Sequence, residues 1–558
     1  MTITTAIERF AAWPGLSASC PGALALAALV VSSVTATASC NRTMGGDSSR
    51  RPDRALEERF PLAALDDRTL CDRLLARTSN KYALFADPAP ERRRKVIVSD
   101  LHLGPGDHAG PRFSGLEDFR FHREWGEFLV AQGWRGPTDL VIAGDFIEFW
   151  QILGALDRLP DSESEVQRDR ELLLAADQDS ALEALEYVLV AHREVFAHIG
   201  RFLASGDHRV IILSGNHDAE LLWPRVRLAI VRAIRPRDPV RILFVDATGY
   251  QHGGVHIEHG HRFDSANRFT TPHAPFGRDS TGRCRLQSSW GAVFVAHFFN
   301  ATEREFPFVD NLYPESAAVL WGLRDEPNTG REVVTVARFL DLLISAESRQ
   351  FNLSALSGAL RSIAGLPARS DDNLGTGEEL VDHLITRLSS NERLFDGLML
   401  LLNDPELRVL WSALVRAAGH LPDIRRSVKE LEAVDPSALE RVRGLFFGDP
   451  MTSAAQQILE RFPHIRTVVV GHSHLPGGTV KDLTRRRRTG YYANTGAWIP
   501  VLRVRDIKDR GVSFGELSVL DRSVFPALFP AVVIEYDGDT PRPPVIEWSG
   551  ERSGHIPP

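Results

Sequence analysis

Five short runs of apolar, mostly β-branched residues recur along the chain, and each ends in a polar segment. They cover residues 95–99 (KVIVS), 139–143, 209–214, 254–258 and 467–470. Continuous apolar runs of this length, several of them followed by glycine, predict strands that are buried on both faces. Helical spacing of apolar residues separates the first three runs, over Glu117–Gln132 and over Asp179–Ala204, with Gly206 as the expected C-cap. The alternation predicts an α/β protein.

The polar segments that follow the runs carry Asp, Asn and His. In chain order they are Asp100-Leu101-His102, Gly144-Asp145-Phe146-Ile147-Glu148, Gly215-Asn216-His217-Asp218, His259-Gly260-His261 and Gly471-His472-Ser473-His474. Because α/β sheets bind ligands at the carboxyl ends of their strands, we expect these segments to meet at one site. Their carboxylate, imidazole and amide groups suffice for two divalent metal ions, which is the equipment for attacking a phosphate ester.

The alternation stops after residue 300. Residues 331–347, 378–390, 406–418 and 437–447 have helical spacing and predict a helical insertion. Two interpretations remain open: a cap that selects the substrate, or an appendage for dimerisation or stability. Beyond the last polar segment, Tyr491–Asn494, Ala531–Tyr536 and Val545–Trp548 predict strands that complete a second sheet. The expected organisation is an N-terminal extension (1–90), a core (91–300), the insertion (301–450) and the rest of the core (451–558).

Composition narrows the function. The 558 residues are 43% hydrophobic and 25% charged, which is typical of a soluble globular protein. A net charge of −8 argues against a protein that coats nucleic acid. It does not exclude a small phosphorylated substrate, because bound metals would supply local positive charge. The four cysteines have no metal-type spacing and imply no disulfide framework; they are Cys20, Cys40, Cys71 and Cys284.

The first 43 residues leave the compartment open. Gly22–Ser39 is an apolar run of small residues followed by Cys40, which fits a secretory leader or a lipoprotein signal. Only Arg9 is basic ahead of the run, whereas Arg42, Arg50, Arg51 and Arg54 follow it, which would keep the main body in the cytoplasm. Translation starting at Met44 is a third interpretation. We predict a cytoplasmic protein, with export or lipidation at Cys40 as the alternative.

A second basic segment lies near the C-terminal strands. Arg485–Arg488 stands between two predicted strands and reads as a hairpin or a loop. A solvated turn is its simplest interpretation, and a patch that attracts phosphates or a membrane surface is the other.

The polar segments resemble those of the calcineurin-like metallophosphoesterase superfamily, whose pattern runs DxH, GDxx(D/E), GNH(D/E), H and GHxH. All five blocks are present in order between Asp100 and His474, and Asn494-Thr495-Gly496 is similar to a further family segment. The resemblance implies a four-layer αββα sandwich of two mixed sheets, here with a helical insertion. It also implies two divalent metal ions, Mn, Fe or Zn, of which Mn is favoured.

Residue roles follow from the same resemblance. One metal would be bound by Asp100, His102 and His474, the other by Asn216, His259 and His472, and Asp145 would bridge both. A bridging hydroxide would then attack phosphorus. His217 would stabilise the transition state, with Glu148 orienting it where protein phosphatases carry a shorter Asp, and His261 would lie near the substrate phosphate. Asp218 is expected to support its loop.

Local detail narrows the expected substrate. Ser99–Leu103 and Gly144–Trp150 are similar to blocks of UDP-2,3-diacylglucosamine hydrolases, which cleave a pyrophosphate bond. Those enzymes have GNRD and HGD where this chain has GNHD and HGH, so the chain resembles a relative of that group. The leading hypothesis is a phosphodiesterase or pyrophosphohydrolase for a small or lipid-linked phosphate ester, which leaves membrane association open. The alternatives are a phosphomonoesterase or protein phosphatase, a repair-type nuclease, and a non-catalytic scaffold.

Overall fold

The computed structural model describes residues 56–76, 83–156, 176–313 and 450–552, with short gaps between 265 and 299 and between 486 and 524. The chain divides into two compact units, Met1–Arg59 and Phe60–Pro558, and the second unit holds every element discussed here. The proposed leader and the helical segments predicted between 331 and 447 lie outside the described residues. No helix within the described ranges is long and apolar enough to cross a membrane.

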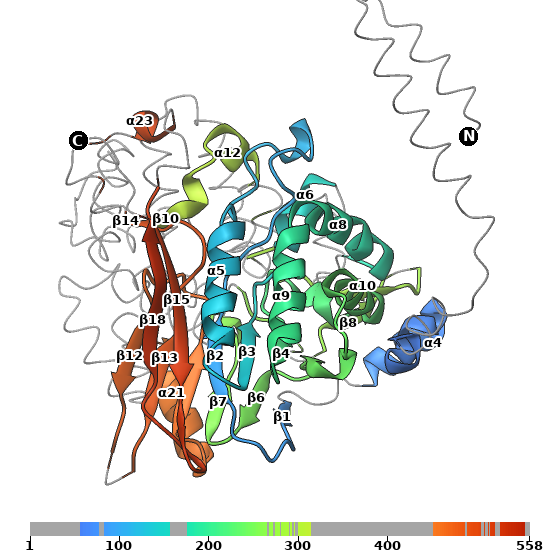
Figure 1. The fold of residues 1–558 in the computed structure, drawn as a ribbon. Helices are drawn as coiled ribbons and strands as arrows, with labels where there is room; N and C mark the ends of the chain where they lie inside the picture. The colour runs from blue at the N-terminus through green and yellow to red at the C-terminus, as the bar shows by residue number, and fades with distance from the viewer. Residues whose placement is uncertain are drawn as a thin grey trace, which may run out of the picture. The chain divides into compact units, whose positions relative to one another are not determined.

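Two six-stranded mixed sheets form the centre of the second unit (Figure 1). The first sheet has the order β18 (Val545–Arg552), β15 (Ala527–Ile534), β2 (Arg94–Val98), β3 (Thr138–Ala143), β4 (Arg209–Leu213) and β5 (Ile242–Phe244). Strands β2 to β5 are parallel, β15 runs antiparallel to β2, and β18 runs antiparallel to β15. The second sheet has the order β1 (Leu84–Ala86), β6 (Gly249–His252), β7 (Val255–Ile257), β11 (Thr467–Val470), β13 (Tyr491–Asn494) and β12 (Thr479–Asp482).

The two sheets share one apolar core. Its members come from alternate positions of both sheets and include Ile97, Val141, Ile211, Ile257 and Val469, all fully buried. Because side chains alternate along a strand, the neighbours Val468 and Val470 face the other way and pack against α21 (Pro450–Arg461). This explains why the runs are apolar throughout instead of alternating with polar residues.

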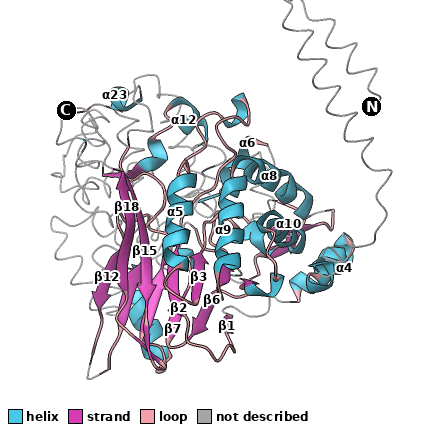
Figure 2. Ribbon diagram, viewed as in Figure 1, coloured by secondary structure: helices cyan, strands magenta, loops and turns pink. Residues whose placement is uncertain are grey.

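Helices cover the first sheet as well (Figure 2). They are α5 (His122–Gly133), α6 (Phe149–Ala155), α8 (Gln178–Ala191), α9 (Arg193–Ser205) and α10 (Pro224–Ile234). Trp125 of α5 packs against Trp498 with ring centroids 5.1 Å apart, and Phe196 of α9 packs against Phe146 after β3 at 5.8 Å. The α/β class is therefore confirmed, as two mixed sheets packed face to face with helices outside them.

Three expectations about individual elements are wrong. Strands β15 and β18 extend the first sheet, because β15 pairs with β2, and only β13 of the three late strands joins the second. Residues 117–121 are not helical, since the Glu117 side chain accepts hydrogen bonds from the backbone of Gly106 and Phe119. The long predicted helix is two helices, which meet at the buried His192.

The remaining elements lie outside the two six-stranded sheets and their main helices. They are α4 (Asp67–Leu75), β8 (Phe276–Arg278), β9 (Cys284–Leu286), α12 (Asn300–Glu305), β10 (Leu312–Tyr313), β14 (Leu502–Arg503), α23 (Phe514–Ser518), β16 (Tyr536–Asp537) and β17 (Thr540–Pro541), with short 3-10 turns between them. Strand β1, from the predicted N-terminal extension, pairs with β6 of the second sheet. The Arg485–Arg488 segment connects the antiparallel strands β12 and β13, which confirms a hairpin there.

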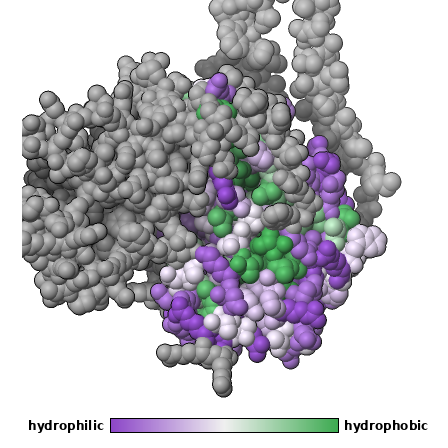
Figure 3. All heavy atoms as spheres, turned by 90° about the vertical axis from the view of Figure 1, so that its left-hand side faces the viewer, coloured by the Kyte–Doolittle hydropathy of each residue, from purple (hydrophilic) through white to green (hydrophobic). Residues whose placement is uncertain are grey.

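The molecule seen from the side of β12 and β18 has a mixed surface (Figure 3). On the part of this face that the described residues form, hydrophobic side chains gather in a patch among hydrophilic ones. Val480 on β12 and Val545 on β18 are among the exposed apolar residues of the chain.

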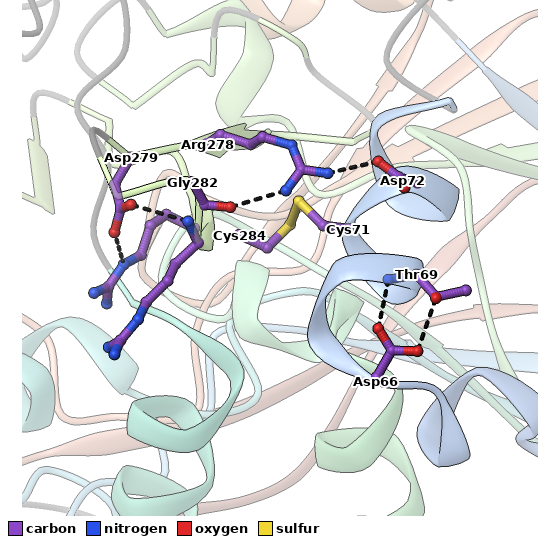
Figure 4. Close-up of a disulfide and its surroundings, with 10 residues drawn as sticks. Asp66, Thr69, Cys71, Asp72, Arg278, Asp279, Gly282 and Cys284 are labelled. Carbon is purple, nitrogen blue, oxygen red and sulfur yellow. Dashed lines mark hydrogen bonds and ion pairs between the residues drawn. A yellow bond between two sulfur atoms is a disulfide. The ribbon is translucent and has the colours of Figure 1, made fainter.

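A disulfide joins Cys71 of α4 to Cys284 of β9, across 213 residues (Figure 4). The cysteine spacing implied no disulfide framework, and this bond was not predicted from the sequence. Polar contacts surround it: Arg278 donates to Gly282 O at 2.8 Å and contacts Asp72, and Asp66 caps α4 by accepting from the backbone of Thr69 at 3.0 Å. Sequence spacing could not reveal the pair, because the two cysteines come from separate elements that only the fold brings together.

Candidate metal centre

The candidate ligands lie where the sheets' strands end. Asp100 follows β2, Asp145 follows β3, Asn216 follows β4, His259 follows β7 and His472 follows β11. The loops after β2 and β3 are tied together, since Asp100 N donates to Gly144 O at 3.1 Å and His102 N donates to Asp145 O at 3.0 Å. The carboxyl ends of parallel strands from both sheets therefore lie close together, and the candidate ligands that follow them form one site.

Glycine before two of the ligands allows the strands to approach closely. Gly144 has a φ of 94°, and a Cβ there would lie within 3.0 Å of the His259 ring. A Cβ at Gly215 would overlap the carboxylate of Asp145 in the same way. The glycines of the Gly-Asp and Gly-Asn segments are therefore needed so that ligands from neighbouring strands can meet.

The backbone at the candidate ligands is strained. Six non-glycine residues among those described have positive φ, and five are predicted ligands: Asp100 (55°), His102 (46°), Asp145 (48°), His472 (71°) and His474 (45°). The left-handed region costs roughly 1–2 kcal/mol for an L-residue, and such residues cluster at functional sites. The strain is local to the loops that turn these side chains toward one another.

The first group of ligand atoms comprises Asp100, His102 and His474, which each offer one atom within 4.8 Å of the others. Nε2 of His102 lies 3.0 Å from Nε2 of His474, and Asp100 Oδ1 lies 3.4 Å from the latter nitrogen. Ligand atoms on opposite sides of an ion bound at about 2.1 Å are roughly 4 Å apart. The spacing therefore fits a single ion.

The second group comprises Asp145, His259 and His472. Asn216 Oδ1 lies 3.1 Å from His259 Nε2, which brings the amide oxygen to the same place. Asp145 Oδ2 is buried and accepts no well-aligned hydrogen bond from the described residues, although His259 Nε2 lies 2.9 Å away. The same atom is 4.0 Å from His102 Nε2 of the first group. Asp145 thus reaches both groups, as a bridging carboxylate must.

Hydrogen bonds to the outer nitrogens orient the histidines. His259 Nδ1 faces Ala143 O at 2.9 Å, and His102 Nδ1 faces Glu148 Oε2 at 2.8 Å. His472 Nε2 lies 3.1 Å from Asp264 Oδ2, which leaves Nδ1 toward the group. Metal-binding histidines characteristically have their other nitrogen fixed in this way. Asp264, which fixes the outer nitrogen of His472, was not identified from the sequence.

Glu148 also holds His217, which belongs to neither ligand group. Its Oε2 lies 2.6 Å from His217 Nδ1, and the indole of Trp150 stacks on the His217 ring with centroids 4.0 Å apart. The His217 side chain is 19% exposed, whereas Glu148 is buried. The imidazole is therefore fixed on two sides, and its Nε2 is the nitrogen left for a bound molecule.

Opposed charges set the ionisation of this network. Burial alone would raise the pKa of Glu148, but the charge on His217 and hydrogen bonds from both histidines lower it to about 2. Burial would lower the pKa of His102, whereas its hydrogen bond with Glu148 and nearby carboxylates raise it to about 10. Burial would also lower the pKa of His259, but the charge of Asp145 and its contact with the ring raise that pKa to about 9. A cation bound here would compete with protons for the imidazole nitrogens.

Two other predicted residues lie close to the centre. The His261 ring is buried between those of His259 and Phe269, at centroid distances of 5.5 Å each, and its nitrogens make no hydrogen bond with the described residues. Burial lowers its pKa well below the ordinary value, with the charge on His259 adding to the effect. Asp218 accepts from Gly215 N at 2.6 Å and from Phe146 N at 2.8 Å, so it ties the two loops together, as expected.

All ten predicted site residues therefore come together at one edge of the two sheets. No family model matches the chain, and no curated protein matches it.

Proposed function

We propose that the chain is a dinuclear metal-dependent phosphoesterase of the calcineurin-like metallophosphoesterase type, acting on phosphodiesters or pyrophosphates. The observation that carries the proposal is the left-handed backbone at five of the seven candidate ligands. Strained backbone of this kind persists only where the surrounding structure enforces it, and it clusters at functional sites. Here the strained residues bring metal-binding side chains together. The two packed mixed sheets are compatible with the fold that this superfamily implies.

The donor set fits two ions. Asp100, His102 and His474 would hold one, and Asn216, His259 and His472 would hold the other, with Asp145 shared. Mixed imidazole and carboxylate donors suit Mn, Fe and Zn alike. Two such ions, when bound, would supply positive charge to a phosphate and lower the pKa of bound water toward neutrality.

His217 is the residue of this chain that would act directly on the substrate. With Nδ1 held by Glu148 and the ring packed against Trp150, its Nε2 is presented to the partly exposed side of the centre. From there it would donate a hydrogen bond to a phosphate oxygen, stabilise the charge that develops there and protonate the leaving oxygen. Glu148 would keep the imidazole in the tautomer and orientation that this requires.

We also infer that the protein works in a compartment where disulfides persist. The bond between Cys71 and Cys284 supports this, because disulfides are rare in reducing cytosol. The inference favours the exported alternative over the cytoplasmic prediction.

The function is tested by following hydrolysis of a chromogenic phosphodiester and of the matching monoester. Metal-stripped protein is resupplied separately with Mn²⁺, Zn²⁺ and Fe²⁺. We expect metal-dependent turnover with the diester hydrolysed faster, because the leading hypothesis is a diesterase. Faster hydrolysis of the monoester would move the assignment to a phosphomonoesterase. Absence of turnover with all three metals, despite bound metal, would contradict the enzyme assignment in favour of a binding scaffold.

A further inference from the structure

A second set of candidate ligands lies outside the metal centre. Asp118, from the loop before α5, Glu303 of α12 and Asp310 of the short turn Val309–Asn311 each offer one carboxylate oxygen within 4.8 Å of the others. Asp118 and Glu303 are 3% and 0% exposed. These residues belong to three separate segments and have no atom in either ligand group of the centre.

Two buried carboxamides point into this set. Gln151 Nε2 donates to Glu303 Oε2 at 2.8 Å and lies 3.4 Å from Asp310 Oδ2, and Asn311 Nδ2 donates to Asp118 Oδ1 at 2.9 Å. The two residues are 5% and 0% exposed, yet Gln151 Oε1 and Asn311 Oδ1 accept no hydrogen bond from the described part of the chain. A buried amide oxygen without a partner requires an explanation, and an ion is one.

The oxygens of these amides would face the carboxylates if the amides were reversed. The nitrogen and oxygen of a carboxamide exchange places on rotation about its last bond, so both oxygens can turn toward the carboxylates. In that arrangement the amide oxygens would face carboxylate oxygens, which a cation lying between them would stabilise. With three carboxylates and two amide oxygens, the set contains only oxygen donors, which suits a hard cation, whereas the His-rich centre suits Mn, Fe or Zn.

We propose that Asp118, Gln151, Glu303, Asp310 and Asn311 form a calcium site separate from the dinuclear centre. Ca²⁺ takes six to eight oxygen ligands in irregular geometry, which five side chains with backbone carbonyls or water can provide, whereas Mg²⁺ demands a regular octahedron. The inference does not depend on the proposed phosphoesterase function.

The site would hold α6 in place. Gln151 follows Trp150, which stacks on His217, and the backbone N of Gln151 donates to Glu148 Oε1 at 3.1 Å. Asn300 of α12 donates to Gln151 O at 3.0 Å. A calcium ion that joins α12 to Gln151 therefore stabilises the helix that carries the residues packed against His217.

The test is calorimetric titration of the metal-stripped, full-length chain with CaCl₂, with thermal unfolding measured in parallel. We expect one Ca²⁺ site and a Ca²⁺-dependent rise in Tm. Asp310→Asn should weaken Ca²⁺ binding by roughly tenfold or more, because affinity at an oxygen site follows the number of charged ligands. Asp145→Asn, which alters the dinuclear centre instead, should bind Ca²⁺ as the wild type does.

Gln151→Glu is a second variant, for which the expected result is a gain of Ca²⁺ affinity instead of a loss. An added carboxylate should tighten Ca²⁺ binding and lower the Tm of the calcium-free protein, because a fourth negative charge then lies among the other three. The proposal is overturned if the wild type binds no Ca²⁺, if Asp145→Asn removes the binding, or if Asp310→Asn and Gln151→Glu leave the affinity unchanged.

Discussion

Asp145→Asn should abolish metal-dependent hydrolysis while leaving the fold intact. Asp145 Oδ2 reaches both groups of candidate ligands, since it lies 2.9 Å from His259 Nε2 and 4.0 Å from His102 Nε2. Asn has the same shape but lacks the charge that would hold two cations together. Because bound metals contribute several kcal/mol of transition-state stabilisation, kcat/KM should fall by roughly 10³-fold or more.

The same substitution should change the stability of the metal-free protein only slightly. Asp145 has a φ of 48°, and Asn tolerates the left-handed region better than most residues. The change removes the charge that raises the pKa of His259, which costs stability, but it also relieves the burial of a carboxylate whose Oδ2 has no well-aligned hydrogen bond among the described residues. The two effects oppose each other, so thermal unfolding after metal removal should give a Tm close to that of the wild type.

Asp279→Asn is the matched control, since it makes the same substitution in the loop between β8 and β9. Its turnover should equal that of the wild type. If Asp145→Asn still bound two metals and kept its turnover, the bridging role assigned to Asp145 would be contradicted. A large fall in its Tm would instead indicate that the residue is structural.

His217→Asn should lower kcat by about 10²–10⁴-fold, the range typical for a general acid, while both metals stay bound. The residue lies outside the Asp100 and Asp145 ligand groups, although it clusters with His102 and Glu148. Its side chain contacts Glu148, Trp150 and the ring of His102, whose centroid is 4.7 Å away. KM should change much less than kcat, because the imidazole is expected to act mainly on charge that develops in the transition state. Metal content and the kinetic constants are measured on the same samples.

Two further variants distinguish a chemical role from a structural one. Glu148→Gln keeps one oxygen acceptor but loses the charge that fixes His217, so its kcat should lie between those of the wild type and His217→Asn. His464→Asn changes an exposed histidine that contacts Gln251 in the second sheet, and it should be neutral for turnover. Loss of a metal from His217→Asn, or an unchanged kcat, would contradict the role given to His217.

The central strands and their polar ends could be predicted because both depend on local sequence. A strand buried on both faces needs an unbroken apolar run, as in Thr467–Val470, whose predicted and observed bounds agree. The direction of the chain then fixes which end of the strand carries the polar segment. Asp100 and Asp145, which end neighbouring parallel strands, therefore had to lie close together.

Features that depend on distant partners could not be predicted in this way. Strand β15 joins the first sheet because β2 offers an unpaired edge, which its own sequence does not reveal. The helix break at His192 depends on contacts with Glu117 and with Gly104 O, about 75 and 88 residues earlier. Asp264 and the carboxylates around Gln151 belong to no sequence motif, and only the fold brings them to their partners.

The most direct test of the central claim is a crystal structure of the protein grown with Mn²⁺, with anomalous scattering used to locate the metal. Two strong peaks about 3.5–4 Å apart are predicted, as in other two-metal sites. One should lie among Asp100, His102 and His474, the other among Asn216, His259 and His472, with Asp145 touching both. A single peak, or peaks only at other residues, would contradict the dinuclear centre.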